Sequence, residues 1–392
     1  MTADDWLDQY YSGEFFSGRF DFLKSFIKKH NLDDFDSIIT IGGTNGKGET
    51  SRCLSKIFTY NNIVHGLWTS PHLKTVLERF CFSHNDDLQH TEVIEVFFDL
   101  KKLCDEDNTK LSYFEFLFIS FLMLAKKKLI KILILEVGLG GRLDAVNALD
   151  ATICGITSIS RDHQDLLGNR YELILKEKLG IIRDNCTIYT SFENDYLRRK
   201  TKEYLKDFKL HWVDLFEVEV NKKEDDFSSR NHALAKQIAK SYFQHKLFRI
   251  PEFNLTALRG FGVIDSVSFS LFPSHNPDGM RKLVQLLVKR NYTYIDLMVL
   301  SFSERSDEDI ETMIRSLKRS FSCPMILFHF HHFKAAKREK LERIGKKFNL
   351  NITNDTAFFN SINYSHKQHL LFTGSNYFLG HIMQKLNLSS SI

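Results

Sequence analysis

One lysine stands in the middle of a glycine-rich stretch near the start of the chain. Gly43, Gly46 and Gly48 surround Lys47, and an apolar, β-branched run precedes them at residues 38–41. Glycines let backbone N–H groups approach a phosphate, and a following helix adds the partial positive charge of its N-terminus to the full charge of the lysine. A glycine-rich turn is common by itself, but its position before a helical pattern at residues 51–58 predicts a nucleotide phosphate loop.

Three more polar side chains come soon after apolar runs. Ser70 follows residues 63–68, Glu136 ends the run at 130–136, and His163 follows the run at 151–159. Ligands of an α/β sheet bind beyond the carboxyl ends of its strands, so we expect these groups near the phosphate loop. A carboxylate there can hold Mg²⁺ or orient water, but it can also be an ion-pair partner, and a lone histidine is often structural. Lys178 fits a surface position and a site position equally well.

Strand and helix patterns alternate from about residue 36 to 190, which predicts an α/β fold with a parallel, doubly wound sheet. Residues 1–36 are predicted to be largely helical, residues 221–230 to be a turn or insertion, and a new helix to begin at Asn231. A second α/β unit is predicted from strands at 267–272, 294–300, 325–330 and 369–373. A linker candidate at 251–262 divides the chain into domains 1–257 and 258–392.

Bulk composition excludes several classes of protein. The chain has 392 residues, 26% charged residues and a net charge of +4, which does not indicate nucleic-acid binding. The N-terminus is acidic and lacks the apolar stretch of a signal peptide, and no apolar run is long enough to span a bilayer. Six cysteines are scattered without metal or disulfide spacing. We therefore expect a soluble, cytoplasmic protein, and a monomer, since no coiled-coil pattern is present.

Four motifs taken together resemble those of the folylpolyglutamate synthases and the bifunctional dihydrofolate synthase/folylpolyglutamate synthases of the Mur ligase superfamily. They lie at residues 43–48, 69–73, 135–144 and 177–181, and weaker similarity occurs at 275–277 and 373–377. The resemblance implies a P-loop-containing first domain that binds ATP and folate and a smaller, Rossmann-like domain that completes the ligase. It implies an ADP-forming enzyme that phosphorylates a carboxylate of a pterin-bearing substrate and joins it to the amine of L-glutamate.

The resemblance also implies roles for individual residues. Those similar to the family's catalytic residues are Lys47, Glu136, His163 and Lys178, of which the family carbamylates the last. Those similar to its ATP-binding residues are Gly43, Thr44, Asn45, Gly46, Lys47, Gly48, Glu49, Thr50, Asn231, Arg259 and His275. The implied ligands of Mg²⁺ or Mn²⁺ are Ser70, Glu136 and His163, and K⁺ is a further implied cofactor. The implied contacts of the pterin or folate are Phe15, Phe16, Ser17, Ser112, Phe114, Leu143 and Asp144.

Three departures from the family pattern keep alternatives open. Glu49 stands where the family has Ser or Thr, Arg259 is displaced by one position, and Phe272 replaces an aspartate that contacts the nucleotide ribose. The expected substrates are ATP, L-glutamate and dihydropteroate or folate. One alternative is a catalytically impaired ATP- and folate-binding paralogue, and another is a folylpolyglutamate synthase that only extends chains. A Mur-type ligase of a UDP-sugar peptide is disfavoured by residues 139–144, and a simple P-loop switch by the absence of a second switch motif.

Overall fold

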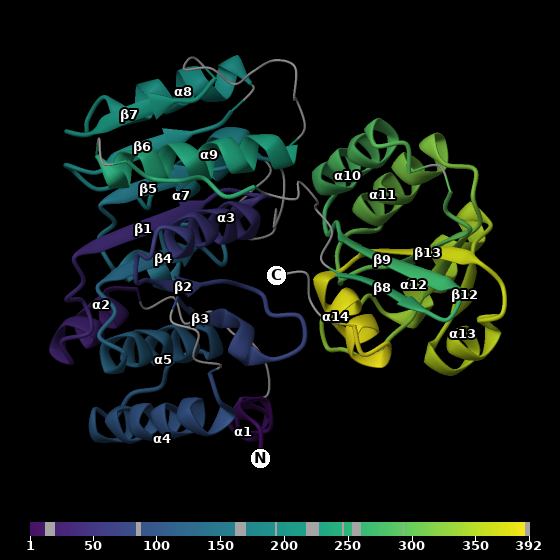
Figure 1. Ribbon diagram of the computed structural model, residues 1–392, viewed down its shortest axis with the longest axis horizontal. Coiled ribbons are helices and arrows are strands. Elements are labelled where there is room, and N and C mark those ends of the chain that lie inside the picture. Colours follow the sequence, from purple (N-terminus) through teal and green to yellow (C-terminus); the bar gives the residue numbers. More distant parts are fainter. Residues whose placement is uncertain are drawn as a thin grey trace. The chain divides into compact units, whose positions relative to one another are not determined.

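The computed structural model describes residues 1–11, 20–83, 88–160, 170–192, 194–216, 227–244, 247–252, 260–292 and 294–388. The chain divides into two compact units, Met1–Asn254 and Leu255–Ile392 (Figure 1). The boundary expected between residues 257 and 258 lies outside the described residues. Among the described residues, no helix combines the length and the apolar character that a membrane crossing needs. All six cysteines are free thiols.

The described part of the first unit contains a seven-stranded sheet. Its strands, in spatial order, are β3 (Phe80–Phe82), β2 (Gly66–Trp68), β4 (Ile132–Glu136), β1 (Ser37–Gly42), β5 (Ile153–Ile156), β6 (Thr187–Thr190) and β7 (His211–Asp214). Neighbouring strands are parallel except β2 and β3, which pair antiparallel. The predicted α/β sheet is confirmed, with an antiparallel edge strand that the sequence patterns did not indicate.

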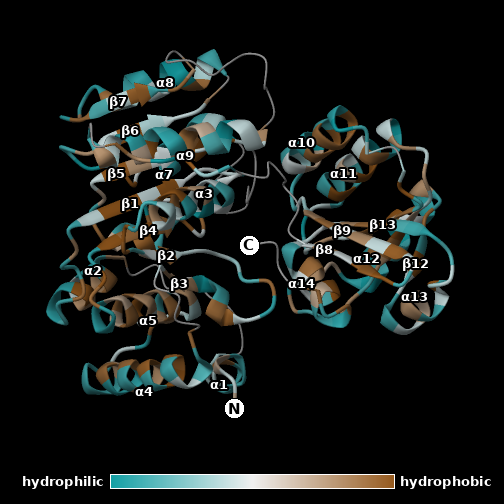
Figure 2. Cartoon of the chain, viewed as in Figure 1, coloured by the Kyte–Doolittle hydropathy of each residue, from teal (hydrophilic) through white to brown (hydrophobic). Residues whose placement is uncertain are grey.

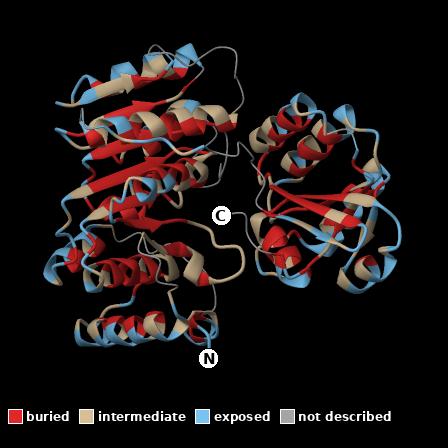
Figure 3. Ribbon diagram, in the orientation of Figure 1, coloured by how far each residue is buried: buried red, intermediate tan, exposed pale blue. Residues whose placement is uncertain are grey.

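Helices cover both faces of this sheet. One face is covered by α1 (Ala3–Tyr10), α2 (Phe20–Lys29), α4 (His90–Glu106), α5 (Tyr113–Lys127), α7 (Tyr171–Leu179) and α8 (Asp195–Leu205). The other is covered by α3 (Lys47–Tyr60) and α9 (Phe227–Phe243). Successive side chains of a strand point to opposite faces, and accordingly Ile38 lies in the first apolar core while Ile39 and Ile41 lie in the second. The central strands are apolar and buried (Figures 2 and 3).

Strand β1 brings the carboxyl ends of its neighbours to one place. Ile41 pairs with Glu136 at the end of β4, and Gly42 pairs with Ile156 at the end of β5. The chain leaves β1 toward the β4 side and only later returns to the β5 side, so the strand order reverses beside β1. Such a reversal leaves a crevice beyond the strand ends, where α/β proteins bind ligands.

The expectation of a turn or insertion at 221–230 is wrong for its described part. Residues 227–230 form the first turn of α9, four residues before the predicted helix start at Asn231. Ser228 is buried there and hydrogen-bonds the side chain of Glu49 on α3. A tertiary contact therefore fixes this turn, and the local composition could not indicate it.

The described part of the second unit contains a six-stranded sheet. Its strands, in spatial order, are β12 (Asn351–Thr353), β11 (Met325–Phe328), β10 (Leu297–Ser301), β13 (Gln368–Gly374), β9 (Val267–Pro273) and β8 (Gly260–Ile264), and only β8 and β9 pair antiparallel. The helices are α10 (Pro277–Lys289), α11 (Asp307–Ser320), α12 (Arg338–Phe348), α13 (Asp355–Ser361) and α14 (Asn376–Lys385). This is the smaller α/β unit that the sequence predicted.

Gly374, at the end of β13, has a φ of +116°, and a Cβ atom there would lie 1.9 Å from the carbonyl oxygen of Ser301. We expect Gly374→Ala to destabilise the second unit by about 1–3 kcal/mol, because both the backbone angle and the carbonyl oppose the methyl group. Gly260→Ala is the control, since its Cβ would lie 3.6 Å from the nearest atom, Met383 Cε, which is an ordinary contact. Calorimetric unfolding of the full chain measures both, and an unchanged Gly374→Ala melting curve would contradict the prediction.

Candidate nucleotide and substrate site

The phosphate loop connects β1 to α3 and needs glycine at two positions. Gly43 has a φ of +132°, and Gly46, the N-cap of α3, has a φ of +93°. A Cβ on Gly43 would lie 2.0 Å from Thr157 Oγ1, and one on Gly46 would lie 2.4 Å from the side-chain amide of Asn231. The loop is therefore pressed between the segment after β5 and the first turns of α9. The predicted strand, loop and helix are all present.

The loop is fastened to the segment that follows β5. Thr44 N donates to Ser158 O at 2.7 Å, and Ser160 N donates to Thr44 Oγ1 at 3.0 Å. Asn45 N donates to Ser158 Oγ at 3.0 Å, while Thr157 Oγ1 donates to Asn45 O at 2.8 Å. No motif prediction from the sequence included Thr157, Ser158 or Ser160. Their position directly after a strand adjacent to the loop was the signal that could have found them.

Two lysines converge on one carbonyl oxygen of the loop. Lys47 Nζ donates to Gly43 O and to Thr44 O, both at 3.1 Å. Lys178 Nζ, from α7, donates to the same Gly43 O at 2.9 Å, and Lys178 is only 4% exposed. Lys178 is therefore buried against the loop and does not lie at the surface, while its role in a site stays a prediction. Both charges lie beside the loop in which phosphates would bind.

Glu136 is buried at the end of β4, 4% exposed, beside the loop. Its Oε2 accepts a hydrogen bond from Ser70 N at 3.0 Å, and a Cβ on Gly48 would lie 3.1 Å from its Oε1. Within the described part of the chain, no lysine, arginine or histidine forms an ion pair with this carboxylate. A buried carboxylate needs a positive partner, so the position suits a divalent cation held by oxygen ligands.

Two of the three metal ligands implied by the family resemblance, Ser70 and Glu136, are thus brought together. The third, His163, lies outside the described residues. In the ranges that the structure describes, no three His, Cys, Asp or Glu side chains group as metal ligands.

The loop that carries Ser70 is held by two acids that the sequence analysis did not single out. Glu78 accepts hydrogen bonds from Leu73 N at 2.8 Å and Lys74 N at 2.7 Å. Asp4, on α1, accepts from Thr75 Oγ1 at 2.6 Å and from Val76 N at 2.8 Å. Asp4 has no local motif, so only its tertiary contacts reveal this role. Glu78 is the acid of a capping box with Thr75, a local pattern that could have found it.

A buried arginine joins this loop to an aromatic wall. Arg79 is 2% exposed, and its Nε donates to His72 Nδ1 at 2.9 Å. Its guanidinium carbon lies 5.8–5.9 Å from the ring centroids of Trp68, Tyr113 and Phe114. Cation–π attraction to three rings offsets part of the cost of burying the charge. No motif in the sequence indicates this cluster.

Asp144 and Phe114 meet over Gly138. A Cβ on Gly138 would lie 2.6 Å from Phe114 Cζ and 3.2 Å from Asp144 Oδ2. Asp144 Oδ2 accepts from Leu139 N at 2.8 Å, and Oδ1 accepts from Val146 N at 3.1 Å. Burial raises the pKa of Asp144 to about 6, although these backbone donors and the charge of Lys47 favour the ionised form.

The other predicted pterin contacts have more varied positions. Ser112 is the N-cap of α5, and its hydroxyl accepts from Glu115 N at 3.3 Å, so the hydroxyl already has a structural partner. Leu143 is half-buried beside Asp144 in the sequence. Phe15, Phe16 and Ser17 lie outside the described residues.

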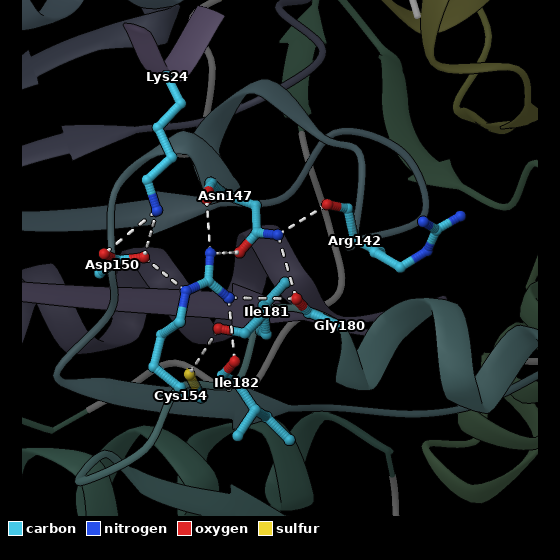
Figure 4. Close-up of polar contacts among 9 residues, drawn as sticks. Lys24, Arg142, Asn147, Asp150, Cys154, Gly180, Ile181 and Ile182 are labelled. Carbon is cyan, nitrogen blue, oxygen red and sulfur yellow. Dashed lines mark hydrogen bonds and ion pairs between the residues drawn. The ribbon is translucent and has the colours of Figure 1, made fainter. Parts of the chain in front are cut away.

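The end of α7 is tied to the segment that carries Asp144. Asn147 Nδ2 donates to Gly180 O at 3.1 Å, and Arg183 Nη2 donates to Asn147 O at 2.9 Å. Arg183 Nε also donates to Asp150 at 2.5 Å. Figure 4 shows Asn147, Gly180 and Asp150 in this network. Because Gly180 follows Lys178 by two residues, the network sets the position of Lys178 relative to Asp144.

The remaining candidates of the first unit cluster at the junction of α3 and α9. Glu49 accepts from Asn231 Nδ2 at 2.7 Å, and Thr50 Oγ1 donates to Asn231 O at 3.4 Å. In the second unit, His275 follows β9 and is half-buried just before α10, whereas Arg259 lies outside the described residues. Phe272 is a core residue of that unit, 2% exposed, with its ring edge against Tyr292.

Known proteins match part of the sequence and the whole fold. No family model matches the chain. The dihydrofolate synthase/folylpolyglutamate synthase of Haemophilus influenzae is 42% identical over 172 residues, 43% of this chain and 38% of that protein. The protein of the same name from Escherichia coli (strain K12) is 40% identical over 146 residues, 37% and 34% of the two chains. The chain spans less than half the length of the curated relatives it matches.

Solved structures superpose on nearly the entire chain. The bifunctional folylpolyglutamate synthase/dihydrofolate synthase from Yersinia pestis CO92 has a TM-score of 0.79 at 21% identity and covers 99% of both chains. The folylpolyglutamate synthase from Thermotoga maritima has a TM-score of 0.78 at 20% identity, covering 98% of this chain and 96% of that one. A bifunctional synthase solved with Mn, AMPPNP and L-glutamate bound has a TM-score of 0.79 at 22% identity, with coverage of 99% and 98%. Over part of its length the chain is therefore a homologue of the dihydrofolate synthase/folylpolyglutamate synthases, and it has their Mur ligase-like fold.

Proposed function

We propose that the chain is an ATP-dependent, ADP-forming ligase that adds L-glutamate to dihydropteroate, to tetrahydrofolate, or to both. The observation that carries the proposal is one cluster in the first unit. The phosphate loop with Lys47, the buried carboxylate Glu136 and the wall of Asp144 and Phe114 lie beyond the ends of adjacent strands. Moving a phosphoryl group requires alignment and charge neutralisation, and these groups supply both.

The reaction has two steps. The substrate carboxylate attacks the γ-phosphorus of ATP, which releases ADP and forms an acyl phosphate. The amine of L-glutamate then attacks the acyl carbon, which releases phosphate and a proton and forms the amide. In this proposal Lys47 and the amides at the start of α3 bind the β- and γ-phosphates. Lys47 would leave the carbonyls of Gly43 and Thr44 to do so.

Glu136 and Ser70, with His163, would hold the divalent ion, Mg²⁺ or Mn²⁺. The buried carboxylate of Glu136, which has no ion-pair partner among the described residues, fits such an ion. The ion would supply charge neutralisation at the phosphates. A structurally similar bifunctional synthase was solved with Mn, AMPPNP and L-glutamate bound, which supports a divalent ion in this proposal. K⁺ belongs to the same proposal, as does a monomeric state.

Lys178 is proposed to be carbamylated in the active protein. Its ammonium shares Gly43 O with that of Lys47, and two positive charges held so close repel each other. The ammonium first loses one proton. Addition of CO₂ to the neutral amine then releases a second proton, so that a carbamate anion replaces the second positive charge. The repulsion then becomes attraction to Lys47, and a further carboxylate-like group stands beside the proposed metal ligands.

Asp144 and Phe114 are proposed to bind the pterin. A carboxyl group can pair with an amino-pyrimidine edge, and an aromatic ring can stack on its face. Leu143, Ser112 and the residues Phe15, Phe16 and Ser17 complete the proposed contacts, while Asn231, Arg259 and His275 are proposed to contact the nucleotide.

The alternative of a catalytically impaired paralogue rested on Glu49 and Phe272. In this structure the Glu49 carboxylate is bound by side chains of α9, and Phe272 packs in the core of the second unit. Both side chains therefore have partners within the protein, and neither departure by itself requires that the protein is inactive. A synthase that only extends the glutamate chain remains the second candidate.

The first test is ADP release by the full chain with Mg²⁺, ATP and L-glutamate, in separate assays with dihydropteroate and tetrahydrofolate. We expect turnover that requires both the pterin substrate and glutamate. Turnover on tetrahydrofolate alone would select the chain-extending enzyme. If neither substrate stimulates ADP release while ATP binds, the impaired paralogue is correct and the ligase proposal is wrong.

Lys178→Ala tests the carbamate. Loss of the carboxylate-like group is expected to lower kcat by about 10²–10³-fold, the size of a lost electrostatic stabiliser, with partial recovery on addition of a short carboxylic acid such as formate. Lys176→Ala, an exposed lysine on the same helix, is the control and should leave kcat unchanged. Loss of activity in Lys178→Ala without any recovery by carboxylic acids would favour a lysine that acts as a cation.

Asp144→Asn tests whether the carboxyl group of Asp144, a proposed pterin contact, has a raised pKa. Since the pKa of Asp144 is raised from 3.8 to about 6, the folded state holds this proton more tightly than the unfolded chain. The contribution of protonated Asp144 to the stability of the folded state is therefore full at low pH and is lost as the pH rises through about 6. The free energy of unfolding of wild type minus that of Asp144→Asn should therefore decrease between about pH 4 and pH 7. Urea unfolding at both pH values measures it, and a constant difference would refute the raised pKa.

A further inference from the structure

Glu49 binds three side chains of α9. Its Oε2 accepts a hydrogen bond from Asn231 Nδ2 at 2.7 Å. Its Oε1 accepts from Ser228 Oγ and lies 3.4 Å from His232 Nε2. Ser228, Asn231 and His232 are all buried. One carboxylate in the first turn of α3 therefore fastens the N-terminal part of α9, by hydrogen bonds that are strong because the acceptor is ionised.

Asn231 is held at three points around the phosphate loop. Its side-chain amide lies against Gly46, since a Cβ there would come within 2.4 Å of both Nδ2 and Oδ1. One N–H of that amide is donated to Glu49, and the Asn231 carbonyl accepts from Thr50 Oγ1 at 3.4 Å. An asparagine amide has two N–H donors and one carbonyl, so the bond to Glu49 fixes which of them face the loop.

We propose that Glu49 is a positioning residue for nucleotide binding, which holds the Asn231 amide against the phosphate loop. The inference rests on the proposed function, because the ligand concerned is the nucleotide. A serine or threonine at position 49 ends one atom beyond Cβ and could not bridge to three partners on another helix. The longer acidic side chain at position 49 thus links α3 to α9, which a short hydroxyl side chain could not do. The hydrogen-bond donors on α9 stabilise its carboxylate.

The negative charge of Glu49 and its hydrogen bonds to α9 are expected to have opposite effects on nucleotide affinity. Two variants separate these effects. Glu49→Gln keeps a side-chain carbonyl that can accept from α9 but removes the negative charge. Glu49→Ala removes both. If the charge alone mattered, both variants would bind nucleotide more tightly, because a negative charge near the phosphates would be gone. If the hydrogen bonds between Glu49 and α9 matter, only the alanine variant loses affinity for the nucleotide.

The experiment is titration of the full chain with ADP and Mg²⁺ by calorimetry. We expect Glu49→Ala to weaken ADP binding by about tenfold, as the loss of one charge-assisted hydrogen bond would, and Glu49→Gln to stay within about threefold of wild type. Asn231→Ala should weaken ADP binding by a similar factor. The double variant Glu49→Ala/Asn231→Ala should bind ADP no more weakly than Asn231→Ala alone. Tighter or unchanged binding by Glu49→Ala, or losses that add in the double variant, would overturn the proposal.

Glu92→Ala is the matched control. Glu92 also lies in the first turn of a helix, α4, and pairs with a residue at the end of another, Lys128, at 2.9 Å. It contacts neither the loop nor α9, so its removal should leave ADP binding unchanged. A loss of affinity equal to that of Glu49→Ala would attribute the effect to general destabilisation and overturn the inference.

Hydrogen exchange of the ligand-free protein gives a readout that does not depend on nucleotide. Glu49→Ala should increase amide exchange in peptides that cover residues 227–235, while Glu92→Ala should not. Unchanged exchange there would mean that Glu49 does not hold α9. A wild-type chain that binds no ADP would refute the proposed function and this role with it. Equal ADP binding by wild type and Glu49→Ala would refute only this role.

Discussion

The arrangement of the glycine-rich loop in the first unit depends on how the loop is fastened to the segment that follows β5. Thr44 and Asn45 exchange backbone and side-chain hydrogen bonds with Thr157, Ser158 and Ser160. A glycine-rich loop by itself has many conformations, and fixing each residue costs about 1–2 kcal/mol of backbone entropy. Hydrogen bonds to the segment after β5 offset this cost, so the loop amides are ordered in the proposed phosphate site. Hydrogen-bond donors that are already ordered lose less conformational entropy when a ligand binds than donors that binding must order.

The same unit buries several charged or ionisable groups close together. Lys178, Glu136 and Asp144 are each at most 5% exposed. Each is satisfied by the backbone: Lys178 by a loop carbonyl, Glu136 by Ser70 N, and Asp144 by Leu139 N and Val146 N. Buried charges without such partners would be expensive. Backbone N–H and C=O groups therefore let the first unit bury three charged or ionisable side chains.

The departures from the family pattern have different physical meanings once the contacts are known. Glu49 looked unfavourable because a carboxylate repels phosphate, yet its oxygens are bound by donors of α9. Phe272 looked like a lost ribose contact, yet its ring packs in the apolar core of the second unit. A residue type indicates chemistry only when the direction of its side chain is known, and that direction depends on what packs around it.

The sequence alone determined the alternation of strands and helices, the phosphate loop and most strand-end polar groups, because these follow from local periodicity and from glycines near Lys47. It also supplied the family resemblance that later comparisons supported. It could not indicate the role of Asp4 or the burial of Arg79, because Thr75, Val76, Tyr113 and Phe114 lie far from them in the chain. Glu78 and the hydroxyl residues after β5 belong to local patterns, a capping box and a strand end, that the predictions overlooked. The predictions also missed the antiparallel strand β3 and the first turn of α9, which are stabilised by tertiary pairing and by Glu49. The tertiary structure decided which polar side chains meet, since strand order and register bring distant residues within hydrogen-bonding distance.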